Sequence, residues 1–156
     1  MFKIRKISDA RSPGNQAAIR DAQRIMREQF PDMDEEDIAK LPQQIEDPLT
    51  YRFVSELFIA HDEADRQSAF ALLLIAPDLA FAYLDTISAA PGQTGGGIGA
   101  ALYERIREEA RASGVKGLYF ECLPDDPALS PQPAIRKQNV ARLRFYERFG
   151  ARPIVG

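Results

Sequence analysis

The sequence has very little of the chemistry that disulfide scaffolds and zinc sites require. Among its 156 residues there is one cysteine, Cys122, one histidine, His61, and no tryptophan. A single cysteine cannot form an internal disulfide, and one cysteine with one histidine cannot supply the ligands of a structural zinc site. We therefore expect no metal cofactor, and the cysteine usage favours a reducing compartment, with the cytoplasm as the default.

Long apolar runs and an excess of positive charge are also missing. The longest apolar segment, residues 69–76, has the length of a strand, whereas spanning a bilayer takes roughly 20 apolar residues. The charged first residues lack the apolar centre of a signal peptide. The net charge of −3 at pH 7 does not suit a nucleic-acid binder. We expect one soluble domain, residues 1–156, with neither a membrane nor a nucleic acid as partner.

The first half of the chain predicts an antiparallel sheet. Residues 2–7 alternate as a strand does, and residues 51–60, 68–75 and 81–88 are three further strand segments separated by short polar links. Strands that follow one another with short links form an antiparallel meander. Two helices are expected between the first strand and the other three, a long one over residues 15–30 and a short one that begins near residue 34 and is ended or kinked by a proline at 42.

After residue 97 the apolar period becomes helical, with one stripe at Ile98, Leu102, Ile106 and Ala110. Residues 115–123 then predict a strand parallel to the one before this helix, because a helix crosses between them. Together these segments predict an α/β fold of the α+β type, with a mixed, mostly antiparallel central sheet and about four helices.

The C-terminal part predicts a proline-rich loop to residue 138, a last helix over residues 139–149, and the opening of a final strand at residues 151–156. That strand stops before it could pair. Two explanations are open: the chain lacks its last strand or strands as part of a longer protein, or it borrows a strand from a partner, as a homodimer would.

Four glycines within five positions separate the fourth strand from the helix that begins at Ile98. Glycine lets the backbone take positive φ and approach a ligand closely, and the N-terminus of a helix attracts phosphate. The turn therefore predicts a phosphate site. A Walker P-loop is excluded, because Gly99 is followed by Ala100 and not by lysine.

A dinucleotide-binding fingerprint is a closer alternative. Gly95, Gly97 and Ala100 fit G-x-G-x-x-A, and Glu121 has the spacing of a ribose-binding carboxylate. However, residues 91–94 separate the strand from the glycines, and the chain after Glu121 is too short for the remaining parallel strands. A dinucleotide-binding oxidoreductase is therefore the weaker interpretation.

Two segments in the correct order resemble the signatures of the GNAT superfamily of acetyl-CoA-dependent N-acetyltransferases. Residues 94–99, TGGGIG, are similar to the acetyl-CoA signature, although Thr94 stands where the family has arginine or glutamine. Residues 139–154 resemble the second signature, in which an asparagine opens a helix, a tyrosine lies two turns on, and FGA leads to the next strand. Residues 84–91 resemble the family's bulged fourth strand. The resemblance covers nearly the whole chain and implies the GNAT fold.

The resemblance implies an enzyme that moves an acetyl or short acyl group from acetyl-CoA to a primary amine of a small molecule or peptide, by direct transfer in a ternary complex. The backbone of Ile87 and Ala89 would pair with pantetheine, and the Ile87 N–H would face the thioester oxygen. Asn139 would bond the pantetheine arm, cap its helix, or do both. The pyrophosphate contacts would come from Thr94, Gly95, Gly96, Gly97, Gly99 and Ala100.

Tyr146 is the candidate general acid, because a phenol with a reference pKa of about 10 is protonated at neutral pH and can donate to the departing thiolate. The alternative is a packing role beside Phe145 and Phe149. Asp85 and Glu121 are the candidates for the base that takes a proton from the amine, and some relatives use no dedicated base. A non-catalytic acyl-CoA-binding module of a longer protein is the remaining alternative function.

Overall fold

The computed structural model describes residues 2–154. Within them the chain forms five strands, six α-helices and one 3₁₀-helix. In chain order they are β1 (Lys3–Ile7), α1 (Pro13–Gln29), α2 (Glu35–Ala39), α3 (Leu41–Glu46), α4 (Pro48–Tyr51), β2 (Val54–His61), β3 (Gln67–Ala76), the 3₁₀-helix (Pro77–Leu79), β4 (Phe81–Ala89), α5 (Ile98–Ala112), β5 (Gly117–Tyr119) and α6 (Pro133–Arg148).

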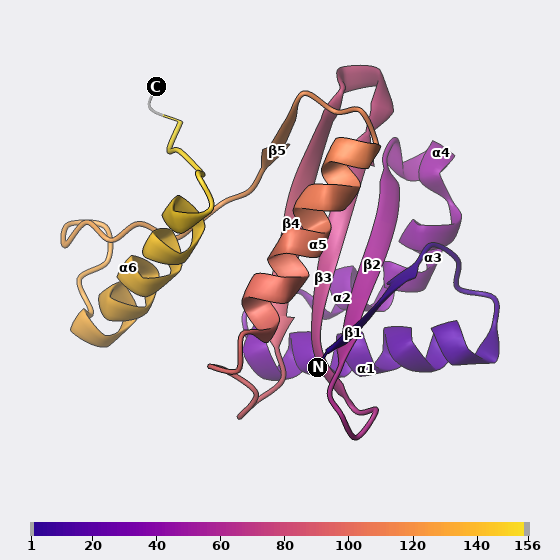
Figure 1. Ribbon diagram of the computed structural model, residues 1–156, viewed down its shortest axis with the longest axis horizontal. Coiled ribbons are helices and arrows are strands. Elements are labelled where there is room, and N and C mark those ends of the chain that lie inside the picture. Colours follow the sequence, from indigo (N-terminus) through magenta and orange to yellow (C-terminus); the bar gives the residue numbers. More distant parts are fainter. Residues whose placement is uncertain (1, 155–156) are drawn as a thin grey trace. The chain divides into compact units, whose positions relative to one another are not determined.

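These elements belong to two compact units, Met1–Phe120 and Glu121–Gly156. The first unit contains the whole sheet and helices α1 to α5 (Figure 1). The second contains the proline-rich loop and α6.

The five strands form one sheet in the order β1-β2-β3-β4-β5. Neighbouring strands are antiparallel except for β4 and β5, which are parallel. The predicted meander and the parallel pair across α5 are both confirmed, as is the mixed, mostly antiparallel fold class. Within residues 2–154 the sheet therefore lacks the run of parallel strands on which a dinucleotide-binding fold is built.

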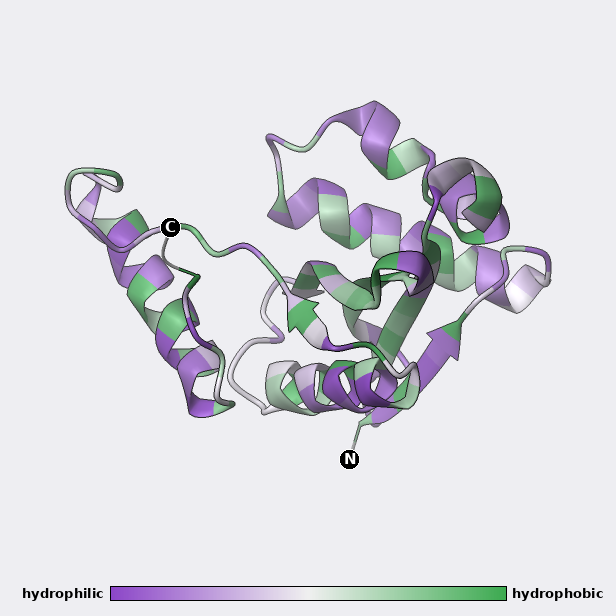
Figure 2. Cartoon of the chain, turned by 90° about the horizontal axis from the view of Figure 1, so that it is seen from above, coloured by the Kyte–Doolittle hydropathy of each residue, from purple (hydrophilic) through white to green (hydrophobic). Residues whose placement is uncertain are grey.

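Helices cover both faces of the sheet (Figure 1). The apolar side of α1, with Ile19 and Ile25, packs with α2 and α3 against one face, which presents Leu57 and Phe70. Helix α5 covers the other face. Figure 2 shows the hydrophobic strands between helices whose outer surfaces are polar. Burying each apolar side chain of this size contributes roughly 1.5–3 kcal/mol, so these two layers hold the first unit together.

The helices number six where the sequence predicted about four. The short helix expected from residue 34 is α2, and the predicted break at Pro42 is confirmed, because α2 ends at Ala39 and Pro42 lies in the first turn of a new helix, α3. Helices α3 and α4 were not predicted. Proline is tolerated in a first turn because the amide hydrogen it lacks has no partner there in any case. The strand predicted over residues 51–60 therefore begins three residues later, at Val54, as β2.

Three C-terminal predictions are corrected. β5 covers only Gly117–Tyr119 of the nine residues expected. α6 begins at Pro133, so Asn139 lies inside this helix and does not cap it; the residue at the N-cap is Gln132. Residues 151–154 form no strand, and the rest of the expected final strand lies outside the described residues.

Candidate functional site

Strand β4 contains the bulge that the family resemblance implied, and Asp85 is the extra residue. Leu72 of β3 is paired with Thr86, whereas the next residue, Leu73, is paired with Leu84. Asp85 therefore has no opposite residue in β3. Its side chain is exposed, and its Oδ2 accepts a hydrogen bond of 2.8 Å from Thr86 Oγ1. Bulges bend a strand and commonly re-aim a side chain beside a functional site.

Beyond the bulge, one edge of β4 is open. Pairing with β5 stops at Tyr83, so among the described residues the stretch from 84 to 89 pairs only with β3. Ala90 N donates to Ser68 O over 2.8 Å. Hydrogen-bonded and non-hydrogen-bonded pairs alternate in an antiparallel ladder. The peptide groups of Ile87 and Ala89 therefore point away from β3, towards the open edge.

The open edge leads directly into the glycine-rich turn, residues 91–97, all of which are exposed. Gly92, Gly95 and Gly97 have φ of +76°, +96° and +81°, in the left-handed region that favours glycine. A Cβ at Gly95 or Gly97 would have no atom within 4 Å. These two glycines are therefore required by the backbone conformation and not by crowding.

Helix α5 begins immediately after Gly97 with unused backbone donors. Its first helical bond runs from Ala101 N to Gly97 O, which leaves the N–H groups of Ile98, Gly99 and Ala100 without a partner inside the helix. No side chain caps this end, and no acidic residue lies in the first turn. Three aligned donors at the positive end of a 15-residue helix make a site for an anion.

The remaining candidate residues lie in the second unit. Asn139 is buried, and its Nδ2 donates to Pro124 O over 2.8 Å and to Ser130 Oγ over 3.2 Å. It thereby holds the proline-rich loop on α6. Tyr146 is also buried, with its ring edge-on to Phe145 at 5.1 Å, and Glu121 is exposed. The structure thus brings Asp85, Ile87, Ala89 and the glycine turn into one unit, and Asn139, Tyr146 and Glu121 into the other.

Cys122 is half-buried, and burial raises the pKa of its thiol. A thiol with a raised pKa is protonated at neutral pH and is a poor nucleophile. Among residues 2–154, no three His, Cys, Asp or Glu side chains form a group that could hold a metal ion.

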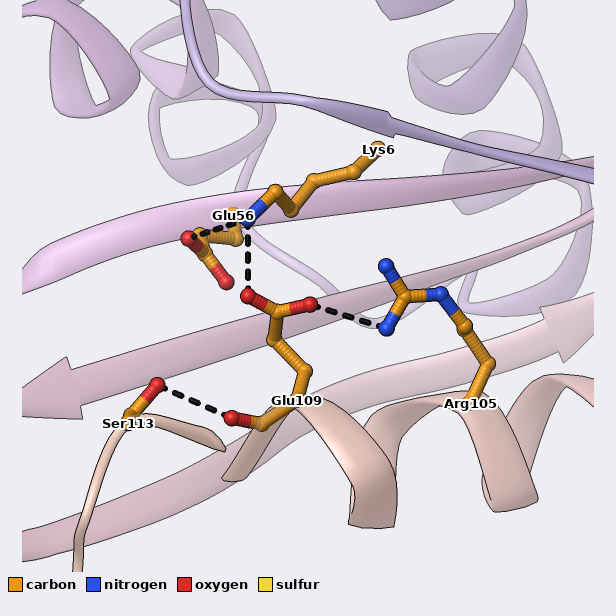
Figure 3. Close-up of polar contacts among 5 residues, drawn as sticks. All are labelled: Lys6, Glu56, Arg105, Glu109 and Ser113. Carbon is orange, nitrogen blue, oxygen red and sulfur yellow. Dashed lines mark hydrogen bonds and ion pairs between the residues drawn. The ribbon is translucent and has the colours of Figure 1, made fainter. Parts of the chain in front are cut away.

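The sequence analysis missed a partly buried ionic cluster that ties α5 to the sheet (Figure 3). Lys6 Nζ of β1 lies 3.2 Å from Glu56 Oε1 of β2 and 2.7 Å from Glu109 Oε1 of α5. Arg105 Nη1 donates to Glu109 Oε2 over 2.8 Å, and its guanidinium lies 5.4 Å from the centre of the Phe58 ring. The Lys6 ammonium therefore bridges two carboxylates from different layers of the first unit.

The two carboxylates of this cluster differ in their electrostatics. Burial, and then the charge of Glu109, raise the pKa of Glu56. Burial acts to raise the pKa of Glu109, but the hydrogen bonds and charges of Lys6 and Arg105 together outweigh it, so this pKa is lowered. Glu56 Oε2 is buried and has no hydrogen-bond partner in the described part of the chain. A charged residue inside an apolar strand was the only sequence signal for this cluster, and it did not reveal the partners.

Within residues 2–154 no helix is both long enough and apolar enough to cross a bilayer.

Comparisons with known proteins agree with this geometry. An aminoglycoside acetyltransferase from an uncultured soil metagenomic sample has a similar structure, with a TM-score of 0.67, 15% identity, and coverage of 100% of this chain and 95% of that one. A second soil metagenomic aminoglycoside acetyltransferase, in complex with sisomicin, has a TM-score of 0.65, 12% identity, and coverage of 99% and 93%. A Trypanosoma brucei acetyltransferase has a TM-score of 0.64, 16% identity, and coverage of 100% and 96%.

At these identities the structural likeness establishes the fold alone. A search of curated protein sequences finds no significant match. Residues 15–130 match the family described as the Acetyltransferase (GNAT) family. That match covers most of the chain and includes the bulged β4 and the glycine turn before α5, two of the features by which the sequence resembled the family; the third, residues 139–154, lies outside the matched range. This protein belongs to the GNAT acetyltransferase family.

Proposed function

We propose that this protein is an N-acetyltransferase that moves an acetyl or short acyl group from acetyl-CoA to a primary amine, directly within a ternary complex. The observation that carries the proposal is the continuous path from the open edge of β4 to the α5 N-terminus. The peptide groups of Ile87 and Ala89 face that edge. An extended chain with amide groups that ends in a pyrophosphate matches both parts of this path.

In this proposal the pyrophosphate is held by backbone donors. Thr94, Gly95 and Gly96 line the exposed turn, Gly97 precedes the helix, and the N–H groups of Gly99 and Ala100 belong to its first turn. Since Thr94 replaces the family's arginine or glutamine, these amide groups supply most of the binding. The helix dipole adds to each donor's attraction for a negative charge.

The pantetheine arm extends the sheet along β4. Ile87 and Ala89 exchange hydrogen bonds with its amides, as a paired strand would. The Ile87 N–H donates to the thioester oxygen, where negative charge develops as the amine attacks. A fixed donor at that oxygen stabilises the transition state more than the ground state. Acetyl-CoA supplies the activated acyl group, and the products are an amide and the free thiol of CoA.

Asp85 is the base in this proposal, with Glu121 as the alternative. The Asp85 carboxylate lies at the bulge, two residues from Ile87. There it can take a proton from the ammonium group of the acceptor, directly or through one water. The hydrogen bond from Thr86 Oγ1 orients the carboxylate. An amine must be neutral before its lone pair can attack a carbonyl.

Tyr146 is the proposed acid that protonates the departing thiolate. Asn139 is proposed to position pantetheine: both hydrogens of its Nδ2 are directed to Pro124 O and Ser130 Oγ, and its Oδ1 can accept from a pantetheine amide. The names of two structurally similar proteins specify aminoglycosides as their acceptors. This supports an amine as the acceptor class here.

Calorimetric titration with acetyl-CoA, followed by detection of free CoA thiol with a panel of amines, tests this function. We expect binding of acetyl-CoA and thiol release that requires an amine. Asp85→Asn should reduce thiol release, while Asp78→Asn, at an exposed carboxylate in the 3₁₀-helix, should not. Binding without release on any amine would favour a non-catalytic acyl-CoA-binding module, and absence of binding would refute the proposal.

A further inference from the structure

An apolar hollow of about 220 Å³ lies in the first unit, where β3 and β4 meet the chain between α4 and β2. Every side chain that lines it is half-buried, so the hollow reaches the surface. A dry cavity of roughly 150 Å³ is enough to hold benzene. The hollow is therefore large enough for one aromatic ring or a branched aliphatic group. Its lining consists of Phe53, Leu74, Ala76, Phe81 and Tyr83.

The hollow opens on the same face of the sheet as the Asp85 carboxylate. Leu72 and Leu74 lie on one face of β3, and their partners in β4 are Thr86 and Tyr83. Residues directly opposite in a sheet share a face. Thr86 Oγ1 donates to Asp85 Oδ2 over 2.8 Å, so the Asp85 carboxylate lies beside the side chain of Thr86. The carboxylate and the hollow therefore follow one another along β4 on the same side.

The distance between them follows from the strand. Tyr83 is two residues before Asp85, and a strand rises about 3.3 Å per residue, so their Cα atoms are roughly 7 Å apart. A cation that contacts the carboxylate and a ring that fills the hollow can thus belong to one small molecule.

We propose that the acceptor is a primary amine that carries an aromatic or branched aliphatic group, with its nitrogen at Asp85 and its apolar group in this hollow. The inference rests on the proposed function, since it assigns Asp85 to the reacting amine. Charge complementarity orients the nitrogen end, and burial of apolar surface retains the other end. A second ammonium placed in the hollow would give up part of its water for aromatic faces and one phenol, with no carboxylate in the lining to balance its charge. Diamines are therefore expected to be poorer acceptors than amines with an apolar group.

The test compares 4-phenylbutylamine with 1,4-diaminobutane in the free-thiol assay, for the wild type and two variants. Ala76→Phe fills the hollow from the end of β3. Ala112→Phe places the same bulk at an exposed position in the last turn of α5 and is the matched control. We expect kcat/KM for the phenyl amine to exceed that for the diamine by at least about tenfold. Ala76→Phe should remove most of this preference, and Ala112→Phe should leave it intact.

The control for folding is the acetyl-CoA affinity of Ala76→Phe. An affinity equal to that of the wild type shows that the variant is folded. Thiol release with equal preference for the two amines, or a preference that Ala76→Phe does not reduce, overturns the inference and leaves the proposed transfer standing. Absence of thiol release with every amine overturns the proposed function. In that case calorimetry with 4-phenylbutylamine tests whether the hollow binds the apolar group. Binding that Ala76→Phe abolishes supports the inference, and absence of binding to the wild type overturns it.

Discussion

The hydroxyl of Tyr146 is the group on which the proposed protonation of the thiolate depends. Tyr146→Phe removes this oxygen and keeps the ring, whose edge-on contact with Phe145 at 5.1 Å supports α6. We expect kcat to fall by about 10²-fold or more, because general acid catalysis contributes on that scale, while acetyl-CoA affinity stays nearly unchanged. Thiol release and calorimetry measure the two quantities.

Tyr119→Phe is the matched control for this substitution, because its side chain is exposed at the end of β5. It should leave kcat unchanged. Equal kcat for Tyr146→Phe and the wild type would mean that Tyr146 is a packing residue, as its neighbours Phe145 and Phe149 are.

Glu56 is a second residue whose effect can be predicted, in this case on stability. Burial raises the pKa of its carboxyl in the folded protein, so the folded state binds a proton at a higher pH than the unfolded state does. Lowering the pH through this folded-state pKa therefore stabilises the fold, and raising the pH removes that gain. Glu56→Gln mimics the protonated form and leaves an oxygen to accept from Lys6.

We expect Glu56→Gln to be neutral or to stabilise the protein by about 1 kcal/mol at pH 7, because the buried Oε2 has no partner in the described chain and faces the charge of Glu109. This advantage should shrink as the pH falls towards the ordinary range for glutamate. Urea unfolding at pH 7 and pH 5 measures it. A loss of several kcal/mol at pH 7 would show that the charged form is the one the fold requires.

At the scale of elements, the start of α5 depends on one backbone conformation. Gly97 has φ of +81°, and no atom lies within 4 Å of a Cβ built there. Gly97→Ala therefore introduces strain and no collision, and should destabilise the protein by about 1–2 kcal/mol. It should also weaken acetyl-CoA binding, since the donors that follow would no longer be held in place.

Gly99→Ala is the matched comparison within the same turn. Gly99 lies inside α5, its φ is not positive, and its Cβ would also have open space. Alanine there gains helix propensity, so stability should stay equal or rise by up to about 1 kcal/mol. Thermal unfolding without ligand separates the two variants. Equal loss in both would contradict a role for the left-handed conformation at Gly97.

At the scale of the whole molecule, ligand binding and stability are linked. Acetyl-CoA at a concentration 100 times its dissociation constant should stabilise the folded state by about 2.7 kcal/mol and raise Tm by roughly 5–10 °C. NAD should leave Tm unchanged, because only β4 and β5 are parallel in the described sheet. A rise in Tm with NAD and none with acetyl-CoA would reverse the assignment of the phosphate site.

Parts of this molecule were accessible from the sequence because their signals are local. Residues 54–61 and 67–76 are apolar runs of strand length that are visible without any partner, and short polar links make neighbouring strands antiparallel. The glycines at 95 and 97 were predictable for the same reason, since a left-handed turn before a helix excludes most other residues.

The ionic cluster could not be predicted in this way. Lys6 is separated by 50 residues from Glu56 and by 103 from Glu109, and nothing in the sequence near any of them names the others. Asn139 was misplaced for a related reason. Asparagine is common at helix starts, but here its amide binds the loop at Pro124 and Ser130, a contact that only packing creates.

The sequence by itself determined the strand and helix types, the glycine turn before α5 and the family, because each depends on residues within a few positions of one another. Tertiary structure decided that Asp85 is the bulged residue, that the peptide groups of Ile87 and Ala89 face the open edge, and that a hollow is lined by Tyr83, two residues before Asp85. These features depend on the register between strands. A shift of one residue in that register would turn every one of these groups the other way.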